Sequence, residues 1–515
     1  MKGKKELRSF KKTIFLIILI FLILQVYKAF DNIVMASGPQ TYYVAPNGND
    51  SNPGDINRPW CTIQHAADTM VAGDTVLIRS GTYHERIKTE HSGDAASGFI
   101  VFSAYPNENP VIDGAGVDTG NNGFSVDNSY IKILGLEICN WPDNGIISSQ
   151  AGYMEISDCK IHDGGGGVGL YDGTHDFSVN RVEMYRLNGG FDASPGGGAD
   201  CYNGVINDCI VRNCSDPDQA PDGFALGHGG EHNFVFNRCE VYGFFDGFDI
   251  SGHDVQINSC SSHDNWNTGY KIWDENVTLI NCLGYNNEEN NLQLPWNNKS
   301  GTVTLRNCDL VGNAQGQNIW VQNRSHGIHM YNCIIACGSN VGLDFEQLGA
   351  ETYQGDYNIF HNNNPDRAVV VRDQELEFSL DMIEAGNWTQ YSGQDQHSVV
   401  CTDLTSQLFR DLANWDFHLK QGSIAIDAGT SNNAPKVDYA GFGRPQGTGY
   451  DIGAYEYGSS SFPSISPQIT PSSTQLKSET TSFTQFWPWT VAIILVIIFL
   501  VTALILLLRR RKNSQ

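Results

Sequence analysis

The sequence predicts an all-β fold in which short strands wind into the coils of a parallel β-helix, a solenoid whose stacked coils share one core. A short segment that begins with cysteine recurs along the chain, for example C-E-V-Y at Cys239, C-S-S-H at Cys260 and C-L-G-Y at Cys282. The intervals between these three cysteines are 21 and 22 residues. A period of this length, with β-branched segments separated by Asn and Gly, is typical of β-helix coils.

The cysteines of this pattern are expected to form a buried ladder of free thiols. Their side chains would point the same way into the core, and parallel side chains on stacked strands poorly match the torsion that a disulfide requires. We therefore expect them to act as small hydrophobic residues. Seven cysteines share the repeat position: Cys159, Cys209, Cys239, Cys260, Cys282, Cys308 and Cys333. Six lie off it, and some of these could pair: Cys61, Cys139, Cys201, Cys214, Cys337 and Cys401.

The charge balance of the chain argues against one class of partner. The 515 residues include 57 acidic and 32 basic side chains, a formal net charge of −25. Such an excess of negative charge disfavours nucleic-acid binding. It does not by itself favour an anionic substrate, because a site for an acidic polymer needs local cations, which a calcium ion could provide.

The N-terminus is typical of an export signal. Five lysines precede the apolar run Ile14–Leu24, and Val34–Ala36 provides small residues at a plausible cleavage site. We expect residues 1–36 to be a signal peptide, with an uncleaved anchor as the alternative.

The C-terminus is typical of a membrane anchor. The run Val491–Leu508 is apolar apart from Thr502 and is long enough to span a bilayer. A transmembrane helix is expected over residues 489–508, followed by a cytoplasmic basic tail at 509–515. The folded part would then lie on the extracellular face of the cell membrane, and we expect it to be monomeric.

A short helix is expected to close the first coil. The segment Pro59–Met70 is amphipathic, with Thr62 as its N-cap, and Ala72–Tyr83 then begins the strands. A helix in this place would cover the open end of the solenoid. This stretch resembles the N-terminal end of secreted right-handed parallel β-helix proteins, and the resemblance implies that fold.

The remaining boundaries follow changes in composition. The β-helix is expected over residues 37–372. Residues 373–457 include G-Y-D-I-G-A-Y-E-Y at Gly449–Tyr457 and resemble the choice-of-anchor Q segment that ends many surface β-helix proteins. We interpret that segment as a completion of the core. Residues 458–488 are rich in Ser, Thr and Pro and are expected to form a stalk.

Three consecutive copies of one strand pattern place charged residues in two columns. The copies read D-G-F-A at Asp222–Ala225, D-G-F-D at Asp246–Asp249 and T-G-Y-K at Thr268–Lys271. If successive copies are neighbouring parallel strands, each column climbs by about 4.8 Å per step. Three carboxylates and one lysine would then converge on a single patch.

This patch suits a calcium ion beside an amine base. Calcium prefers about six to eight oxygen ligands, several of them carboxylates. Without a cation, Asp222, Asp246 and Asp249 would repel one another, so we expect these three residues to bind calcium. Calcium and partial burial both disfavour the ammonium form of Lys271. Its pKa is therefore expected to fall, which would allow the amine to abstract a proton.

A uronic acid polymer suits this pair of functions. The proton on the carbon that bears the carboxylate is weakly acidic, calcium would stabilise the developing anion, and Lys271 would take the proton. The bond to the leaving sugar then breaks by β-elimination. Hydrolysis would instead call for a pair of carboxylates.

The same strands resemble a known active site. The runs P-D-G-F-A-L, F-D-G-F-D-I and T-G-Y-K-I-W look like the active-site strands of family-nine polysaccharide lyases, the calcium-dependent pectate lyases. The resemblance implies that Asp222, Asp246 and Asp249 bind calcium and that Lys271 is the base. That family commonly has two adjacent aspartates before G-F-D, and Phe245 stands at the first of these positions.

Three tryptophans and one arginine are candidate substrate contacts. Trp273, Trp296 and Trp320 could stack on sugar rings or pack at the lip of the site, and Arg324 could pair with a substrate carboxylate.

The first hypothesis for the function is a lyase acting on polygalacturonate or a related polyuronate. The alternatives are a non-catalytic carbohydrate-binding or adhesin-type solenoid, and a β-helix hydrolase or epimerase.

Overall fold

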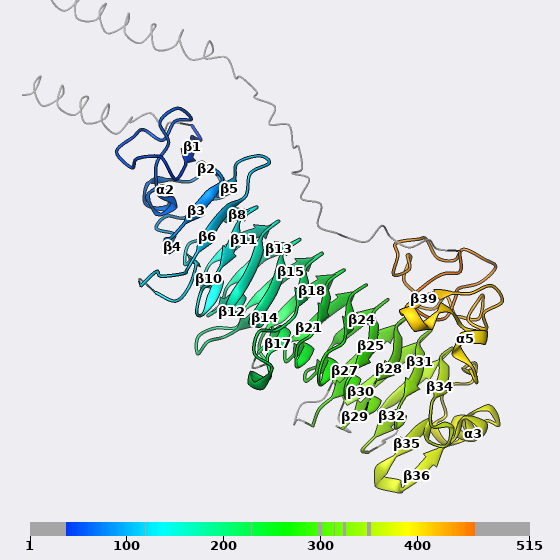
Figure 1. Ribbon diagram of the computed structural model, residues 1–515. Helices are drawn as coiled ribbons and strands as arrows, with labels where there is room; N and C mark the ends of the chain where they lie inside the picture. The colour runs from blue at the N-terminus through cyan, green and yellow to red at the C-terminus, as the bar shows by residue number, and fades with distance from the viewer. Residues whose placement is uncertain are drawn as a thin grey trace, which may run out of the picture. The chain divides into compact units, whose positions relative to one another are not determined.

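The coils present three faces, and on each face the strands of successive coils stack in parallel (Figure 1). The structure is a computed structural model that describes residues 38–118, 120–227, 229–296, 301–313, 315–322, 326–347 and 352–458. The coils follow one another in chain order, so residues about one period apart in the sequence lie side by side. The predicted parallel β-helix is confirmed.

The first face of the solenoid is a 13-stranded parallel sheet. Its strands are β1 (Thr41–Val44), β2 (Thr75–Ile78), β5 (Ile100–Ala104), β8 (Ile131–Leu134), β11 (Gly152–Ser157), β13 (His175–Asn180), β15 (Tyr202–Asn207), β18 (His232–Asn237), β21 (His253–Asn258), β24 (Val277–Ile280), β27 (Gly301–Arg306), β30 (His326–Tyr331) and β33 (Tyr353–Asp356).

The second and third faces are joined into one sheet because two long strands, β12 (Lys160–Tyr171) and β14 (Glu183–Ser194), run through both. The second face holds β3 (Gly81–Tyr83), β6 (Pro110–Asp113), β9 (Glu137–Cys139), β16 (Ile210–Arg212), β19 (Glu240–Tyr242), β22 (Ser261–His263), β25 (Leu283–Asn287), β28 (Asp309–Asn313), β31 (Ile334–Gly338), β34 (Ile359–Asn362) and β37 (Val399–Val400).

The third face carries the predicted site and is called the site face below. It holds β4 (Ile87–Lys88), β7 (Phe124–Val126), β10 (Asn144–Ser149), β17 (Asp222–Leu226), β20 (Asp246–Ile250), β23 (Thr268–Ile272), β26 (Asn290–Leu294), β29 (Gln317–Val321), β32 (Val341–Phe345) and β35 (Val369–Val371), with β36 (Leu376–Phe378) antiparallel to β35.

The cysteine ladder is present as predicted. The seven repeat cysteines are at most 1% exposed, and the thiol of Cys260 accepts a hydrogen bond of 3.3 Å from the backbone N–H of Cys239. Burial raises the pKa of the Cys159 thiol to about 12, which leaves that thiol inert. All twelve cysteines whose side chains the structure describes are free thiols, including five of the six off the column; the side chain of Cys337 lies outside the described residues.

Each coil turns sharply just before its cysteine. Asp208, Asn281 and Asn307 immediately precede a repeat cysteine and adopt left-handed backbone angles, with φ between 51° and 56°. Asn and Asp tolerate this conformation better than other side chains. This turn accounts for part of the Asn in the repeats; others stack from coil to coil, as Asn237 does when its Nδ2 donates to Oδ1 of Asn207 at 2.9 Å.

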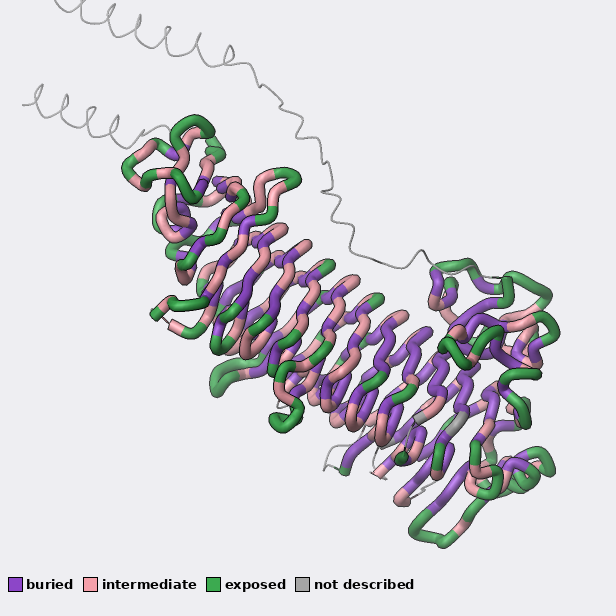
Figure 2. The backbone as a smooth tube through the Cα atoms, in the orientation of Figure 1, coloured by how far each residue is buried: buried purple, intermediate pink, exposed green. Residues whose placement is uncertain are grey.

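Apolar side chains fill the interior of the coils, and buried residues recur in the stacked strands of successive coils (Figure 2). Beneath the site face, aromatic rings stack from coil to coil. The ring of Phe248 lies 4.9 Å from that of Phe224 and 5.1 Å from that of Tyr270. This stack fixes the strand segments that carry the predicted site on their outer side.

Replacing Phe248 by alanine is expected to cost about 3–5 kcal/mol of unfolding free energy, because a fully buried ring is lost from the middle of the stack. Denaturant unfolding followed by circular dichroism measures the loss. The control is Val205→Ala, at a 36% exposed position of β15, which should cost less than about 1 kcal/mol. Equal effects of the two changes would contradict the packing described here.

The N-terminal helix forms where it was predicted. Helix α2 spans Ile63–Thr69, and the side chain of its N-cap Thr62 accepts a hydrogen bond of 3.2 Å from the backbone N–H of His65. One expectation was wrong. The strands begin at β1, before the helix and not after it, because Thr41–Val44 pairs in parallel with β2.

The chain after β35 first adds Phe378 and Trp388 to the main core, and from Cys401 onward it folds against the outside of the coils. It forms α3 (Leu380–Glu384), α4 (Asn387–Ser392), α5 (Leu404–Gln407) and the antiparallel pair β38 (Phe409–Asp411) and β39 (Asp416–Leu419). Short 3₁₀ turns occur at Pro217–Gln219, Pro365–Arg367, Arg372–Gln374 and Leu412–Asn414. A second apolar cluster joins this segment to outward-facing residues of the second face, including Leu283, Val311 and Ile359.

Several expectations fall on parts of the chain outside the described residues: the signal peptide 1–36, the stalk after residue 458, the membrane span 489–508 and the basic tail 509–515. Within the described ranges, no helix combines the length and apolar character needed to cross a bilayer.

Candidate active site

The observed register brings the predicted columns together on the site face. Asp222 pairs with Asp246, and Ala225, Asp249 and Lys271 follow one another on β17, β20 and β23. In each strand the aromatic residue of the motif points into the core and its charged neighbours point outward. Gly247 is required beneath this row, since a Cβ there would lie 2.0 Å from the hydroxyl of Ser262.

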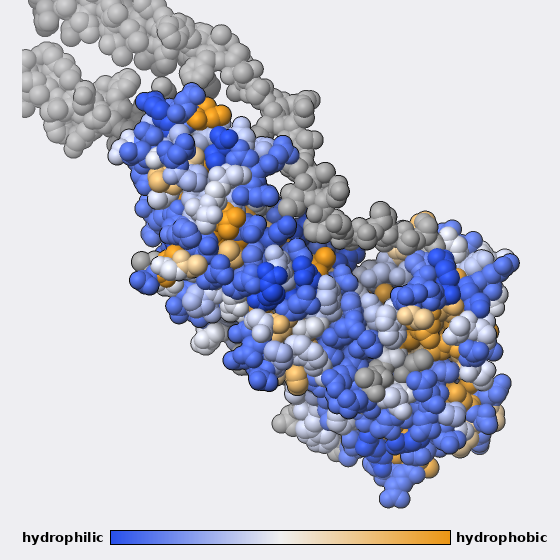
Figure 3. Space-filling view, viewed as in Figure 1, coloured by the Kyte–Doolittle hydropathy of each residue, from blue (hydrophilic) through white to orange (hydrophobic). Residues whose placement is uncertain are grey.

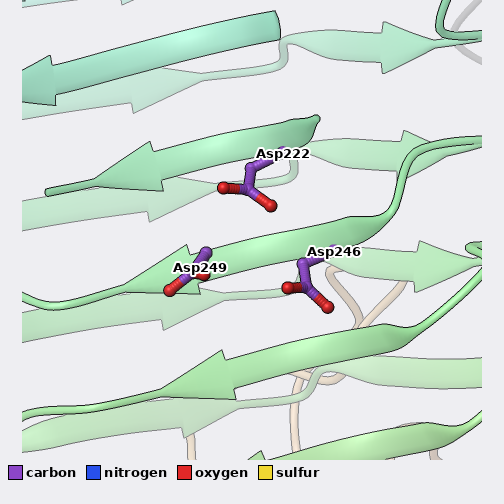
Figure 4. Close-up of side chains that lie close together, drawn as sticks. All are labelled: Asp222, Asp246 and Asp249. Atoms are coloured by element: carbon purple, nitrogen blue, oxygen red, sulfur yellow. The ribbon is translucent and has the colours of Figure 1, made fainter. Parts of the chain in front are cut away.

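Three carboxylates form the centre of the site. Asp222 lies on one strand and Asp246 and Asp249 on the next, on the same side of the sheet (Figure 4). One carboxylate oxygen from each lies within 4.8 Å of the others. Asp246 is 1% exposed, whereas the other two are half-buried. An all-oxygen donor set of this kind is what calcium prefers.

The charge on these groups is only partly balanced within the protein. Burial, followed by the charges of Asp249 and Asp246, raises the pKa of Asp222 to about 8. The pKa of Asp249 is also raised, mainly by burial. When all three carboxylates are ionised and Lys271 is protonated, the four groups carry three negative charges and one positive charge. The remaining charge of −2 is one that a divalent cation would neutralise, so the residues fit calcium.

Lys271 lies against two of the carboxylates. Its Nζ is 2.9 Å from Oδ2 of Asp246 and 3.1 Å from Oδ2 of Asp249. Burial alone would lower the pKa of Lys271, but the charges of Asp246 and Asp249 outweigh it and raise the pKa above its ordinary value. The protein's own groups therefore do not produce the lowered pKa of Lys271 that was expected from the sequence. That expectation included the charge of a bound calcium ion and underestimated the two ion pairs.

Neighbouring side chains hold the carboxylates in place. Asp246 Oδ1 accepts hydrogen bonds from Nδ2 of Asn267 at 2.8 Å and from the backbone N–H of Thr268 at 3.1 Å. Asp249 Oδ1 accepts one from the indole Nε1–H of Trp273 at 2.7 Å. The Nζ of Lys271 lies 5.1 Å from the centre of the same indole ring. Trp273 therefore positions Asp249 and Lys271, a role that the sequence did not suggest.

The other predicted substrate contacts are dispersed along the site face. Trp320 stands in the Lys271 column two coils further on, after Gln293. Trp296 follows β26 and is 60% exposed. Arg324 lies outside the described residues. Phe245, at the position where the family commonly has an aspartate, is half-buried beside Asp246 and offers no ligand oxygen.

Sequence reasoning missed one polar connection. Thr268 Oγ1 donates to Gln293 Oε1 at 3.3 Å, and Gln293 Nε2 donates to Gln322 Oε1 at 3.0 Å. Gln293 occupies the repeat position of Lys271 one coil further on. Extending the two predicted columns by one more copy of the repeat would have identified it.

Comparison with known proteins agrees with this geometry. The family model described as Pel9A-like, right-handed β-helix region matches residues 42–321, which is 280 of the 515 residues. The chain belongs to the Pel9A-like β-helix family. The match confirms the right-handed winding, and it includes every coil that contributes to the carboxylate and lysine cluster.

Individual relatives of this Pel9A-like chain are more distant. It is 48% identical over 75 residues to the uncharacterized protein YwoF of Bacillus subtilis, a match covering 15% of this chain and 16% of that protein. It is 25% identical over 322 residues to pectate lyase L of Paenibacillus polymyxa, covering 55% and 67% of the two chains. The solved complex of XylC with xylose is 12% identical, with a TM-score of 0.54 over 81% of this chain and 99% of that one, and shows the fold alone.

Proposed function

We propose that this protein is a polysaccharide lyase that cleaves polygalacturonate or a related polyuronate by β-elimination, with calcium as cofactor. One observation carries the proposal. The amine of Lys271 (Nζ) lies within 3.1 Å of two of the three carboxylates that could hold a cation. The names of relatives such as pectate lyase L support the same substrate class.

In the proposed reaction the aspartates would bind the ion and Lys271 would act as the base. Asp222, Asp246 and Asp249 would hold the ion, and Asn267 and Trp273 keep two of these carboxylates oriented. When bound, calcium would offset the carboxylate charges that raise the pKa of Lys271 and would stabilise negative charge on the substrate. The neutral amine of Lys271 takes the proton from the carbon that bears the substrate carboxylate. The C–H electron pair becomes the new C=C bond, and the leaving sugar oxygen takes the pair of the C–O bond.

Hydrolysis fits the cluster less well. A glycoside hydrolase needs one carboxyl group as acid and another as base or nucleophile. Here the carboxylates of Asp246 and Asp249 both engage one lysine, an arrangement that suits charge neutralisation and proton abstraction.

We infer that the protein works outside the cell. The support is in the sequence: an export signal at 1–36, a Ser/Thr/Pro-rich stalk at 458–488 and an apolar run followed by Arg509, Arg510 and Arg511. Protease treatment of intact cells tests this proposal. Loss of the β-helix with retention of a small membrane-bound fragment is the expected result, and full protection of the β-helix would overturn it.

Incubation of the full-length protein with polygalacturonate and calcium tests the activity. Ultraviolet absorbance from unsaturated sugar ends is expected to accumulate. Reducing ends without such absorbance would indicate a hydrolase, and inverted sugar configuration without chain cleavage would indicate an epimerase. Binding without any product would indicate a carbohydrate-binding protein.

A further inference from the structure

A second hollow lies on the site face beyond the cluster, in the direction of the C-terminus. Its volume is about 430 Å³, and it is lined by Trp296, Gln322, Glu346, Gln347, Arg372 and Asp373. These residues follow the ends of β26, β29, β32 and β35, so they belong to four successive coils. From Lys271 on β23 to β32 is three coils, or roughly 14 Å at about 4.8 Å per coil.

A row of hydrogen-bonded side chains connects this hollow with the candidate active site. Thr268, which donates its backbone N–H to Asp246, contacts Gln293, and Gln293 contacts Gln322 on the wall of the hollow. The row runs across the coils, along the direction in which the columns climb. An extended polysaccharide cleaved at Lys271 and lying along this row would reach the hollow within a few sugar units.

The charges in the hollow disfavour a carboxylate ligand. Among its described lining residues Arg372 is the one cation, and its guanidinium already binds the buried carboxylate of Asp344, with Nε 2.8 Å from Oδ1. Nε of Arg372 also lies 3.7 Å from Glu346. Since Glu346 and Asp373 line the same space, a sugar carboxylate would meet two further acidic side chains and a guanidinium that is already neutralised.

One polar atom of the lining calls for a different partner. Oε1 of Gln347 is buried and makes no hydrogen bond within the described structure. This atom is an acceptor. A sugar hydroxyl can donate to it, whereas an ionised carboxylate cannot. The ring of Trp296, 60% exposed at the rim, offers an apolar face for the C–H side of a sugar ring.

We propose that this hollow is a specificity subsite for an uncharged sugar unit, a few residues from the bond that is cleaved. The inference rests on the proposed function, and it narrows the substrate class: the preferred polymer combines uronates with uncharged units. Such a unit is either a neutral sugar or a uronate whose carboxylate is esterified. A polymer of free uronates alone would place a carboxylate among Glu346, Asp373 and Asp344.

The kinetic test compares three polymers with the full-length protein: polygalacturonate, a polymer in which uronate alternates with a neutral sugar, and methyl-esterified pectin. We expect kcat/KM to be about tenfold higher on one of the two mixed polymers, which corresponds to about 1.4 kcal/mol. Preference for the alternating polymer identifies a neutral sugar, and preference for pectin identifies an esterified uronate. The highest kcat/KM on polygalacturonate would overturn the proposal.

Substitutions in the hollow test whether its residues cause the substrate preference. The double change Glu346→Gln and Asp373→Asn should raise kcat/KM on polygalacturonate several-fold through a lower KM. Trp296→Ala should raise KM on the preferred polymer about tenfold, with a smaller effect on kcat. The matched control is Trp415→Ala, which removes a 36% exposed tryptophan that packs near Tyr285 on the second face. Identical kinetics of the Trp296→Ala and Trp415→Ala variants would overturn the subsite.

A binding measurement separates this inference from the proposed function. Calorimetry with alternating uronate–neutral oligosaccharides needs no turnover. If no polymer yields unsaturated product, the lyase proposal fails, yet weaker binding by the Trp296→Ala protein would still establish the subsite. Equal binding by the wild-type protein and that variant would exclude the subsite, whether or not the protein is a lyase.

Discussion

Replacing Lys271 by arginine is expected to lower the rate of unsaturated product formation by about a hundredfold to ten-thousandfold, the range for loss of a general base. Arginine can keep the ion pairs that Lys271 makes with Asp246 and Asp249, so the fold and the charge of the site are conserved. Its guanidinium cannot be deprotonated in proteins and therefore cannot accept the proton.

The measurement is the initial rate of ultraviolet absorbance increase on the best polymer at saturating calcium. Circular dichroism and the thermal midpoint of the Lys271→Arg protein should match those of the wild-type protein, which separates a catalytic loss from unfolding. Lys271→Ala should be equally inactive and also less stable at neutral pH, because it leaves Asp246 buried without its cation. If the arginine variant retained more than about a tenth of the activity, Lys271 would not be the base.

Calcium is expected to stabilise the wild-type protein and to be required for turnover. An ion that binds only the folded state adds about 2.7 kcal/mol at one hundred times its dissociation constant. The thermal midpoint should therefore rise as calcium is added, and excess chelator should abolish product formation. The Asp222→Asn protein should lose both responses, because it removes one of three clustered carboxylates and its charge.

Asp254→Asn provides the control for the calcium experiment. Asp254 belongs to the same coil as Asp246 and Asp249, but it lies on the first face with a side chain 49% exposed. Its substitution removes the same charge and should leave the calcium response unchanged. A calcium-dependent rise in the thermal midpoint that persists in Asp222→Asn would place the ion elsewhere.

The repeat pattern was sufficient to predict which residues meet. Because Asp246 and Lys271 occupy fixed positions in copies one period apart, parallel stacking determines their columns without knowledge of side-chain conformations. The thiol ladder could be predicted for the same reason, because its cysteines share one repeat position. The N-cap Thr62 could be predicted from the local sequence of the helix alone.

The balance of charges and the lateral contacts could not be predicted in that way. The pKa of Lys271 depends on distances of about 3 Å to two carboxylates, and a sequence period gives only which strands are adjacent. The contact of Trp273 with Asp249 depends on a rotamer at the end of β23. The hollow around Trp296 is formed by strand ends from four coils, and no repeated motif marks it.

The cluster of carboxylates and lysine is assembled across stacking interfaces, with Asp222, Asp246 and Lys271 each supplied by a different coil. In a solenoid, each layer is held mainly by its immediate neighbours, so opening can begin at either end and progress inward. Fraying of the outermost layers would leave these residues together, whereas separation of β20 from β23 would part the lysine from both of its counter-charges. Enzymatic turnover would thus be lost when the central coils separate, and it would persist when only the coils at the ends unfold.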